Sequence, residues 1–245
     1  MTHKTKIIFM NMTLNEYLTI VIPCKNEGDV VMKTLDLLNY QKQIENLNVI
    51  VCDCSTDSTR EKLNSREKDN FNLTIIEGGF PSVARNNGAK LVKTKYVLFL
   101  DADMFILEQT LLWRCVNKIM NSDGHLLTIK AQSTNGKYNS VFNTFFIQQK
   151  IMKNFEPFCL GGFMMMNTEK FWTYGGFNEK VLIAEDFQLS RKVTPKKFII
   201  DEGRIFTSPR RFENKGLFYM IKLMFKLYIN KNNESYFSDD KEYWS

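Results

Sequence analysis

The feature that most constrains the fold of this 245-residue chain is an alternation of short apolar runs and segments with helical periodicity over its first hundred residues. Uninterrupted apolar runs are typical of strands that are covered on both faces, as in parallel sheets. We expect strands at 18–23, 47–52, 73–76 and 96–100, and helices at 28–40, 56–64 and 82–92. This order predicts an α/β, Rossmann-like fold with a mostly parallel central sheet flanked by helices.

The second half of the chain is less regular. Its periodicity predicts helices at 108–120, 143–153 and 217–229 and strands at 126–131 and around 164–166. No internal repeat interrupts the chain, so we expect a single domain at 18–212, with a nucleotide-binding half (18–104) and an acceptor or catalytic half (105–212). A polar leader (1–17) would precede this domain, and an amphipathic helix with a tail (213–245) would follow it.

Composition excludes several classes of protein. With 44% hydrophobic and 24% charged residues, the chain is typical of a globular domain. No window approaches 18 apolar residues and no signal peptide is visible, so we expect a cytoplasmic protein, with the cytoplasmic face of the membrane as an alternative place. Five cysteines and two histidines supply no second ligand pair beside Cys52 and Cys54, which argues against zinc.

The net charge of +6 is concentrated near the C-terminus, where 191–231 holds eleven Lys or Arg against three acids. Such a stretch can meet nucleotide phosphates or anionic lipid, and we expect no nucleic-acid partner. The helix expected at 217–229 can lie on a membrane surface or dock on the core, and docking is the interpretation that we favour. Its predicted apolar face consists of Leu217, Met220, Ile221, Met224, Phe225 and Tyr228.

Two carboxylates follow the apolar run at 96–100. Asp101 and Asp103 come at the carboxyl end of this expected strand, where open α/β sheets have their binding crevice. Hard oxygen ligands of this kind suit Mg²⁺ or Mn²⁺, which can bridge a nucleotide diphosphate. Asp-x-Asp is also common in turns, but its position after a buried strand favours a metal site.

Other polar residues should reach the same edge of the sheet. Asp53, at the end of the second strand, either accepts hydrogen bonds from a uracil or guanine base or belongs to a turn, and its chemistry leaves both open. Arg85 begins a helix beside this edge. It can hold a phosphate, clamp the acidic cluster or be an ordinary surface arginine.

Together these segments resemble the family 2 glycosyltransferases of the GT-A fold, over about residues 18 to 212. The matching segments, in chain order, are 21–27, 53–57, 84–88, 100–103, 161–163, 175–179 and 185–191. The resemblance implies a nucleotide-diphospho-sugar donor (a UDP- or GDP-sugar), Mn²⁺ or Mg²⁺, a glycan or lipid-linked acceptor and inversion at the anomeric carbon.

The resemblance also assigns roles to residues. Asp53 would contact the nucleobase, Asp101 the ribose or the metal shell, and Asp103 would be the main metal ligand. Asp186 would be the general base, with its pKa raised by Glu185. The further donor-site residues would be Pro23, Glu27, Arg85, Arg210 and Arg211. The acceptor region would contain Gly161, Gly162, Phe163, Trp172 and Phe177, although core packing is the interpretation that we favour for any single aromatic.

The chain departs from the family pattern in two places. Cys52 replaces the first of two acids often found at the end of the second strand, which puts the base preference in doubt. A late histidine of the metal shell has no counterpart, and the basic cluster in its region is Arg204, Arg210 and Arg211.

Two other functions compete with sugar transfer. A sugar-nucleotide-forming nucleotidyltransferase usually carries a Gly-rich phosphate loop where this chain has Pro23 to Glu27. A catalytically silent sugar-nucleotide-binding protein would not need Asp101, Asp103 and Asp186, all of which are present.

Overall fold

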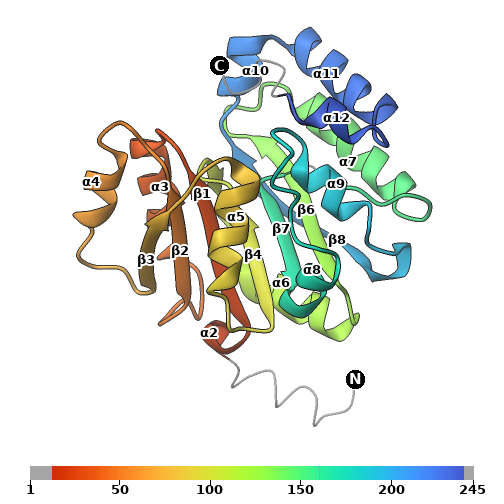
Figure 1. Ribbon diagram of the computed structural model, residues 1–245. Coiled ribbons are helices and arrows are strands. Elements are labelled where there is room, and N and C mark those ends of the chain that lie inside the picture. The colour runs from red at the N-terminus through yellow and green to blue at the C-terminus, as the bar shows by residue number, and fades with distance from the viewer. Residues whose placement is uncertain (1–12, 160, 240–245) are drawn as a thin grey trace.

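The computed structural model describes residues 13–159 and 161–239. This part of the chain folds around one eight-stranded sheet with the order β3-β2-β1-β4-β7-β6-β8-β5 (Figure 1). Helices cover both faces of the sheet, and most of its strand pairs are parallel. The predicted fold class is confirmed.

The first half of the chain has the alternation that its sequence predicts. The strands are β1 (Leu18–Cys24), β2 (Asn48–Asp53), β3 (Asn72–Glu77) and β4 (Tyr96–Leu100), and the helices between them are α3 (Gly28–Leu38), α4 (Thr59–Asn64) and α5 (Pro81–Lys90). All pairs among these strands are parallel. Their carboxyl ends therefore share one edge of the sheet, which we call the carboxyl edge.

The second half completes the sheet with both strand directions. β7 (Phe163–Asn167) is antiparallel to β4 and to β6 (Leu126–Ser133), whereas β8 (Phe198–Thr207) is parallel to β6 and antiparallel to β5 (Met104–Phe105). Strand β8 was not predicted, because Asp201, Glu202 and Gly203 interrupt its apolar pattern. A register shift opposite Ile129 and Lys130 accommodates the extra residues of β8.

The remaining helices include short ones that periodicity does not reveal. They are α2 (Leu14–Tyr17), α6 (Leu111–Asn121), α7 (Asn139–Met152), α8 (Thr168–Thr173), α9 (Glu185–Ser190), η1 (Pro195–Lys197), α10 (Arg210–Lys215), α11 (Leu217–Ile229) and α12 (Glu234–Phe237). Figure 1 shows α7, α9, α10, α11 and α12 gathered beyond the carboxyl edge. Of the predicted leader and tail, residues 1–12 and 240–245 lie outside the described residues. None of the helices in the described ranges has the length and hydropathy of a membrane crossing.

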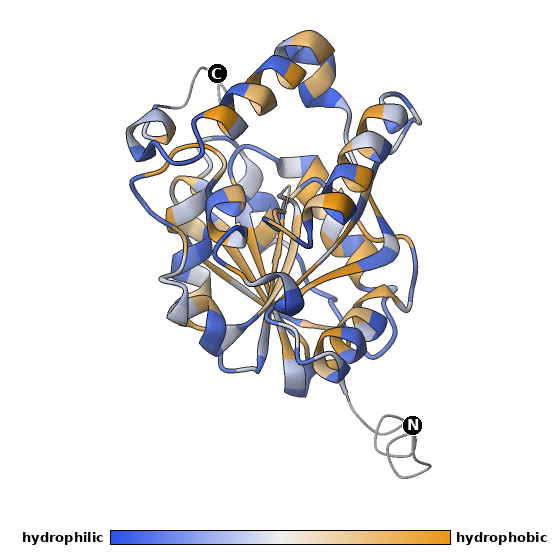
Figure 2. Cartoon of the chain, turned by 90° about the vertical axis from the view of Figure 1, so that its right-hand side faces the viewer, coloured by the Kyte–Doolittle hydropathy of each residue, from blue (hydrophilic) through white to orange (hydrophobic). Residues whose placement is uncertain are grey.

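Apolar side chains pack on both faces of the parallel strands. Ile20 and Ile22 of β1 belong to one core cluster, whereas Val21 between them belongs to the other. Figure 2 shows largely orange strands in the middle of the molecule, with helices of mixed colour around them. Burial on both faces explains why the strands appear in the sequence as continuous apolar runs.

Helix α5 approaches β1 and β2 closely through Gly88. A Cβ atom at this position would overlap Val21 Cγ1 and lie 2.9 Å from Cys52 Sγ. We therefore expect Gly88→Ala to lower the free energy of unfolding by about 1–3 kcal/mol, the usual cost of overpacking. Urea denaturation measures this difference. Gly28→Ala is the matched control, because its Cβ would meet its nearest neighbours at 3.5 Å and should change stability by less than about 1 kcal/mol.

Candidate active site

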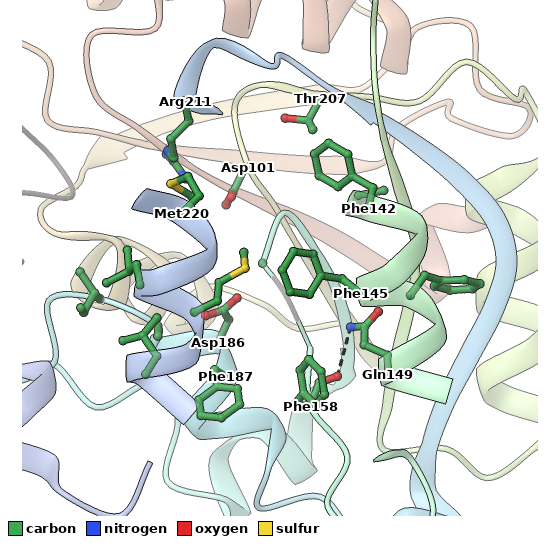
Figure 3. A pocket seen from close by; sticks show the side chains of 18 of the residues that line it. Asp101, Phe142, Phe145, Gln149, Phe158, Asp186, Phe187, Thr207, Arg211 and Met220 are labelled. Carbon is green, nitrogen blue, oxygen red and sulfur yellow. Dashed lines mark hydrogen bonds between the residues drawn. The ribbon is translucent and has the colours of Figure 1, made fainter. Parts of the chain in front are cut away.

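A cavity of about 260 Å³ lies between the carboxyl edge, α7, α9 and α11. Figure 3 shows α7 and α11 on its two sides. Asp101, Asp103, Asp186, Arg85 and Arg211 contribute its polar lining. The rest of the wall is largely apolar and includes Phe142 and Phe145 of α7 and Met220 of α11, all of which are labelled in Figure 3.

A tight turn after β4 presents Asp101 and Asp103 at the carboxyl edge. The Met104 N–H donates to the Asp101 carbonyl at 3.1 Å, and the Asp101 N–H donates to the Gly162 carbonyl at 3.1 Å. The Thr207 hydroxyl, at the end of β8, donates to Asp103 Oδ2 at 3.3 Å. Burial, followed by the negative charge of Asp101, raises the pKa of Asp103 to about 6.

Arg85 joins Asp101, at the end of β4, to α9. Its side chain is buried, and its guanidinium donates to Asp101 Oδ1 at 2.5 Å and to Glu185 Oε1. Burial by itself lowers the pKa of Arg85, but the charges of Asp101 and Glu185 outweigh it and keep the pKa above its ordinary value. Arg85 is therefore not a surface arginine. It clamps the acidic cluster, which is one of the three roles considered for it.

Asp186 lies within the same acidic cluster. It follows Ala184, whose left-handed backbone (φ 57°) precedes α9. Burial, followed by the charge of Glu185, raises the pKa of Asp186 to about 7, although Arg85 opposes this shift.

Gly161 shows how close the acids from the two halves of the chain come. A Cβ at Gly161 would lie 2.8 Å from Asp186 Oδ2 and 3.8 Å from Asp101 Oδ2. The predicted acids therefore converge at one cavity, and the glycine leaves them the space to do so.

Glu27, directly before α3, pairs with Arg210, the first residue of α10. Arg210 donates to Glu27 Oε1 at 2.5 Å. Both charges, like that of Arg211, influence the pKa of Asp103, so these groups surround the same acid. Pro23 lies near the end of β1, paired in register with Cys52, and does not line the cavity.

Asp53 is fully buried and already has hydrogen-bond partners. Its Oδ1 accepts from the Ser55 N–H at 3.2 Å and from the Ser55 hydroxyl, and its Oδ2 accepts from Arg60 Nε at 2.8 Å. A nucleobase contact at Asp53 thus requires Ser55 or Arg60 to change partner. Arg60 was not predicted, although its place on the helix after Asp53 was a signal for it.

The structure does not bring Phe163, Trp172 or Phe177 to this cavity. Phe163 is a core residue, and the Phe177 ring packs against Phe99 with centroids 4.9 Å apart. Trp172 belongs to α8 and is 41% exposed. Helix α8 directly follows β7, and the end of β7 pairs with the start of β4. Trp172 therefore lies at the edge of the sheet opposite to the carboxyl edge. Of the predicted acceptor-region residues, Gly161 lines the cavity, while Gly162 is buried beside it.

Other aromatic residues line the cavity instead. They are Phe142, Phe145, Phe146, Phe158, Phe187, Phe212 and Tyr228. Phe187 lies in a segment that matches the family pattern, and Tyr228 lies on the predicted apolar face of 217–229. Neither signal places these residues at a cavity, because an aromatic residue at helical spacing is equally typical of a core.

The residues at the acidic end fit a cation that is shared with a substrate. Nowhere in the described ranges do three His, Cys, Asp or Glu side chains form a metal-binding group. Mg²⁺-type ions at phosphate sites, however, are usually held by one or two carboxylates together with the phosphates themselves. Asp101 and Asp103 provide such a pair, and a cation held by them would offset the negative charge of these two carboxylates.

Comparison with known proteins gives a consistent result. A model of glycosyl transferase family 2 matches residues 19–175. The poly(ribitol-phosphate) beta-glucosyltransferase of Bacillus spizizenii is 35% identical over 132 residues, which are 51% of this chain and 21% of that protein. The putative teichuronic acid biosynthesis glycosyltransferase TuaG of Bacillus subtilis is 32% identical over 88 residues, which are 35% of each. The chain thus spans well under half the length of these relatives.

Solved structures show the same fold. Staphylococcus aureus TarS in complex with UDP aligns with a TM-score of 0.62 at 22% identity, covering 81% of this chain and 62% of that one. The mannosyltransferase PcManGT of Pyrobaculum calidifontis, in complex with GDP-Man and Mn²⁺, aligns with a TM-score of 0.64 at 17% identity, covering 84% and 63%. Both are similar to this chain in fold.

The buried Arg85 clamp leads to a stability prediction. Because Arg85→Gln leaves Asp101 and Glu185 without their cation, we expect the free energy of unfolding to fall by about 3–5 kcal/mol. Arg85→Lys should recover part of this loss, since it keeps the charge but not the two-armed geometry. Chemical denaturation measures both. Lys137→Gln, which breaks an exposed pair with Glu213, is the control and should cost less than about 1 kcal/mol. Equal effects of Arg85→Gln and Lys137→Gln would contradict the clamp.

Proposed function

Because the chain belongs to glycosyltransferase family 2, we propose that it transfers a sugar from a nucleotide-diphospho-sugar donor to an acceptor hydroxyl. The observation that carries the proposal is the convergence of Asp101, Asp103 and Asp186 on one cavity. The relatives named above are glycosyltransferases, and the two solved neighbours were obtained with UDP and with GDP-Man. We propose a glycan or lipid-linked acceptor.

Residues at the acidic end of the cavity would bind the donor. Asp103 and Asp101 would hold Mn²⁺ or Mg²⁺, which when bound offsets the charge of the departing nucleoside diphosphate. Arg211 lines the cavity and can add a charge-assisted hydrogen bond to a phosphate. Arg210 can do the same if it exchanges Glu27 for the phosphate.

Asp186 would act as the general base. Its raised pKa, about 7, is close to the range where a carboxylate accepts a proton most usefully at neutral pH. Taking the proton from the acceptor hydroxyl lets that oxygen attack the anomeric carbon while the nucleoside diphosphate leaves from the opposite side. Such a displacement inverts the configuration at the anomeric carbon, and we propose this inverting course. Arg85 takes no part in bond changes and positions Glu185 and Asp101.

Replacing the proposed base tests the chemical step. We expect Asp186→Asn to lower kcat by roughly 10²–10⁴-fold, because proton transfer contributes that much, and to leave donor affinity nearly unchanged. The release of nucleoside diphosphate from UDP- and GDP-sugars in the presence of Mn²⁺ measures kcat. Calorimetric titration measures the donor affinity. Asp29→Asn, at a carboxylate 91% exposed, is the control. If the wild type bound a donor tightly but released no nucleoside diphosphate, the protein would be a catalytically silent sugar-nucleotide-binding protein and the proposed transfer would be wrong.

Replacing the proposed metal ligand tests the cation site without relying on activity. In wild type, Mn²⁺ should increase the thermal stabilisation by UDP, which reaches about 2.7 kcal/mol at a hundredfold excess over the Kd. Asp103→Asn should bind UDP with little response to Mn²⁺, since it removes one of the two carboxylates. If Asp103→Asn and the Asp29→Asn control responded to Mn²⁺ alike, the cation would not bind at this site.

A further inference from the structure

We propose that the outer face of helix α11 docks on the surface of an anionic membrane, with the catalytic cavity directly behind it. This goes beyond sugar transfer, because it names an interaction surface. Figure 1 shows α11 at the edge of the molecule, beyond the sheet.

Helix α11 is apolar around most of its circumference. Apart from Lys222 and Lys226, its thirteen residues are aliphatic, aromatic or methionine. Its inner face packs against the rest of the protein, since Met220 and Leu223 are buried and Met224 lines the cavity. A helix that merely docked on the core would need apolar side chains on that inner face alone.

The outer face carries a second apolar row. Phe218, Ile221, Phe225 and Ile229 follow one another at helical spacing and are 84%, 46%, 65% and 63% exposed. Ile221 and Phe225 were predicted on one apolar face together with Met220, whereas the structure exposes them and buries Met220. Contiguous exposed rows of this kind mark interaction sites or membrane contacts.

Charge identifies an anionic partner. Helix α11 contains no acid, and Lys222 and Lys226 are exposed beside the apolar row. An apolar row next to lysines on one short helix is the pattern of helices that lie in the interface of a bilayer. A second copy of the chain would instead bring the lysines of both helices together, and α11 offers no carboxylate to pair with them.

The helix is held in place at its C-terminal end. Phe237 of α12 is fully buried, and the Leu182 N–H donates to its carbonyl at 2.9 Å. Lys231, two residues beyond α11, forms an ion pair with Glu156. The outer row is therefore presented by an anchored element. If sugar transfer is the function, docking would also bring the cavity mouth near a lipid-linked acceptor, a consequence that rests on the proposed function.

Vesicle sedimentation of the full chain tests the proposal. Wild type should sediment with vesicles of equal parts phosphatidylcholine and phosphatidylglycerol, and less with phosphatidylcholine alone. The double variant Phe218→Glu and Phe225→Glu should lower partitioning more than tenfold. Lys222→Gln and Lys226→Gln should each lower it roughly fivefold on the anionic vesicles. Leu91→Glu, at a half-exposed leucine that follows α5 at the opposite edge of the sheet, should bind as wild type does.

Two results would overturn the proposal. One is a wild type that stays in solution with the anionic vesicles. The other is a dimer in size-exclusion chromatography that the Phe218→Glu and Phe225→Glu variant converts to a monomer, which would assign the face to a second copy. The circular dichroism spectrum and the melting temperature without ligand, retained in every variant, show that folding is intact. Donor turnover in vesicle-free solution tests sugar transfer separately, so the two proposals can fail independently.

Discussion

The buried guanidinium of Arg85 is the interaction on which the arrangement of the site depends. It pairs with Asp101 at the end of β4 and with Glu185 at the start of α9. Carboxylates brought together in a partly desolvated cavity repel one another, and only an opposite charge between them makes the arrangement stable. The two arms of one arginine therefore hold the end of β4 and the start of α9 together.

One arginine does not neutralise the whole cluster, and this excess of negative charge has chemical consequences. Asp103 and Asp186 keep raised pKa values because burial and neighbouring acids outweigh the cations that face them. Asp101 and Asp103 at the end of β4 are suited to a cation, and Asp186, whose pKa is raised by burial and by Glu185, is suited to proton transfer. The same excess of negative charge thus underlies both proposed roles, cation binding at Asp101 and Asp103 and proton transfer at Asp186.

The irregular second half of the chain provides the walls of the cavity. Helix α7 contributes phenylalanines on one side and α11 contributes methionines and leucines on the other. The ion pair between Glu27 and Arg210 connects α10, in the second half of the chain, to the loop between β1 and α3 in the first half. Because α11 lines the cavity with one face and leaves the other exposed, it is the element that connects the proposed chemistry to the proposed membrane contact.

The sequence by itself determined the alternating first half, the carboxyl edge and the presence there of Asp101 and Asp103. These features are local: a strand buried on both faces must be apolar throughout, and an acid directly after it must lie at its end. Even the neighbouring Glu185 and Asp186 could be identified, because they belong to a matched segment.

Only the tertiary structure decided which contacts those residues make. Arg85 could have been a surface residue, and its burial against Glu185, a hundred positions away, depends on how α5 and α9 meet. Phe177 packs in the core while Phe142 lines the cavity, although both have the same side chain. Strand β8 forms because a neighbouring strand accommodates its bulge. In each case the contacts that stabilise the arrangement are made with residues distant in the chain. A local sequence pattern cannot specify such contacts, because they exist only once the chain has folded.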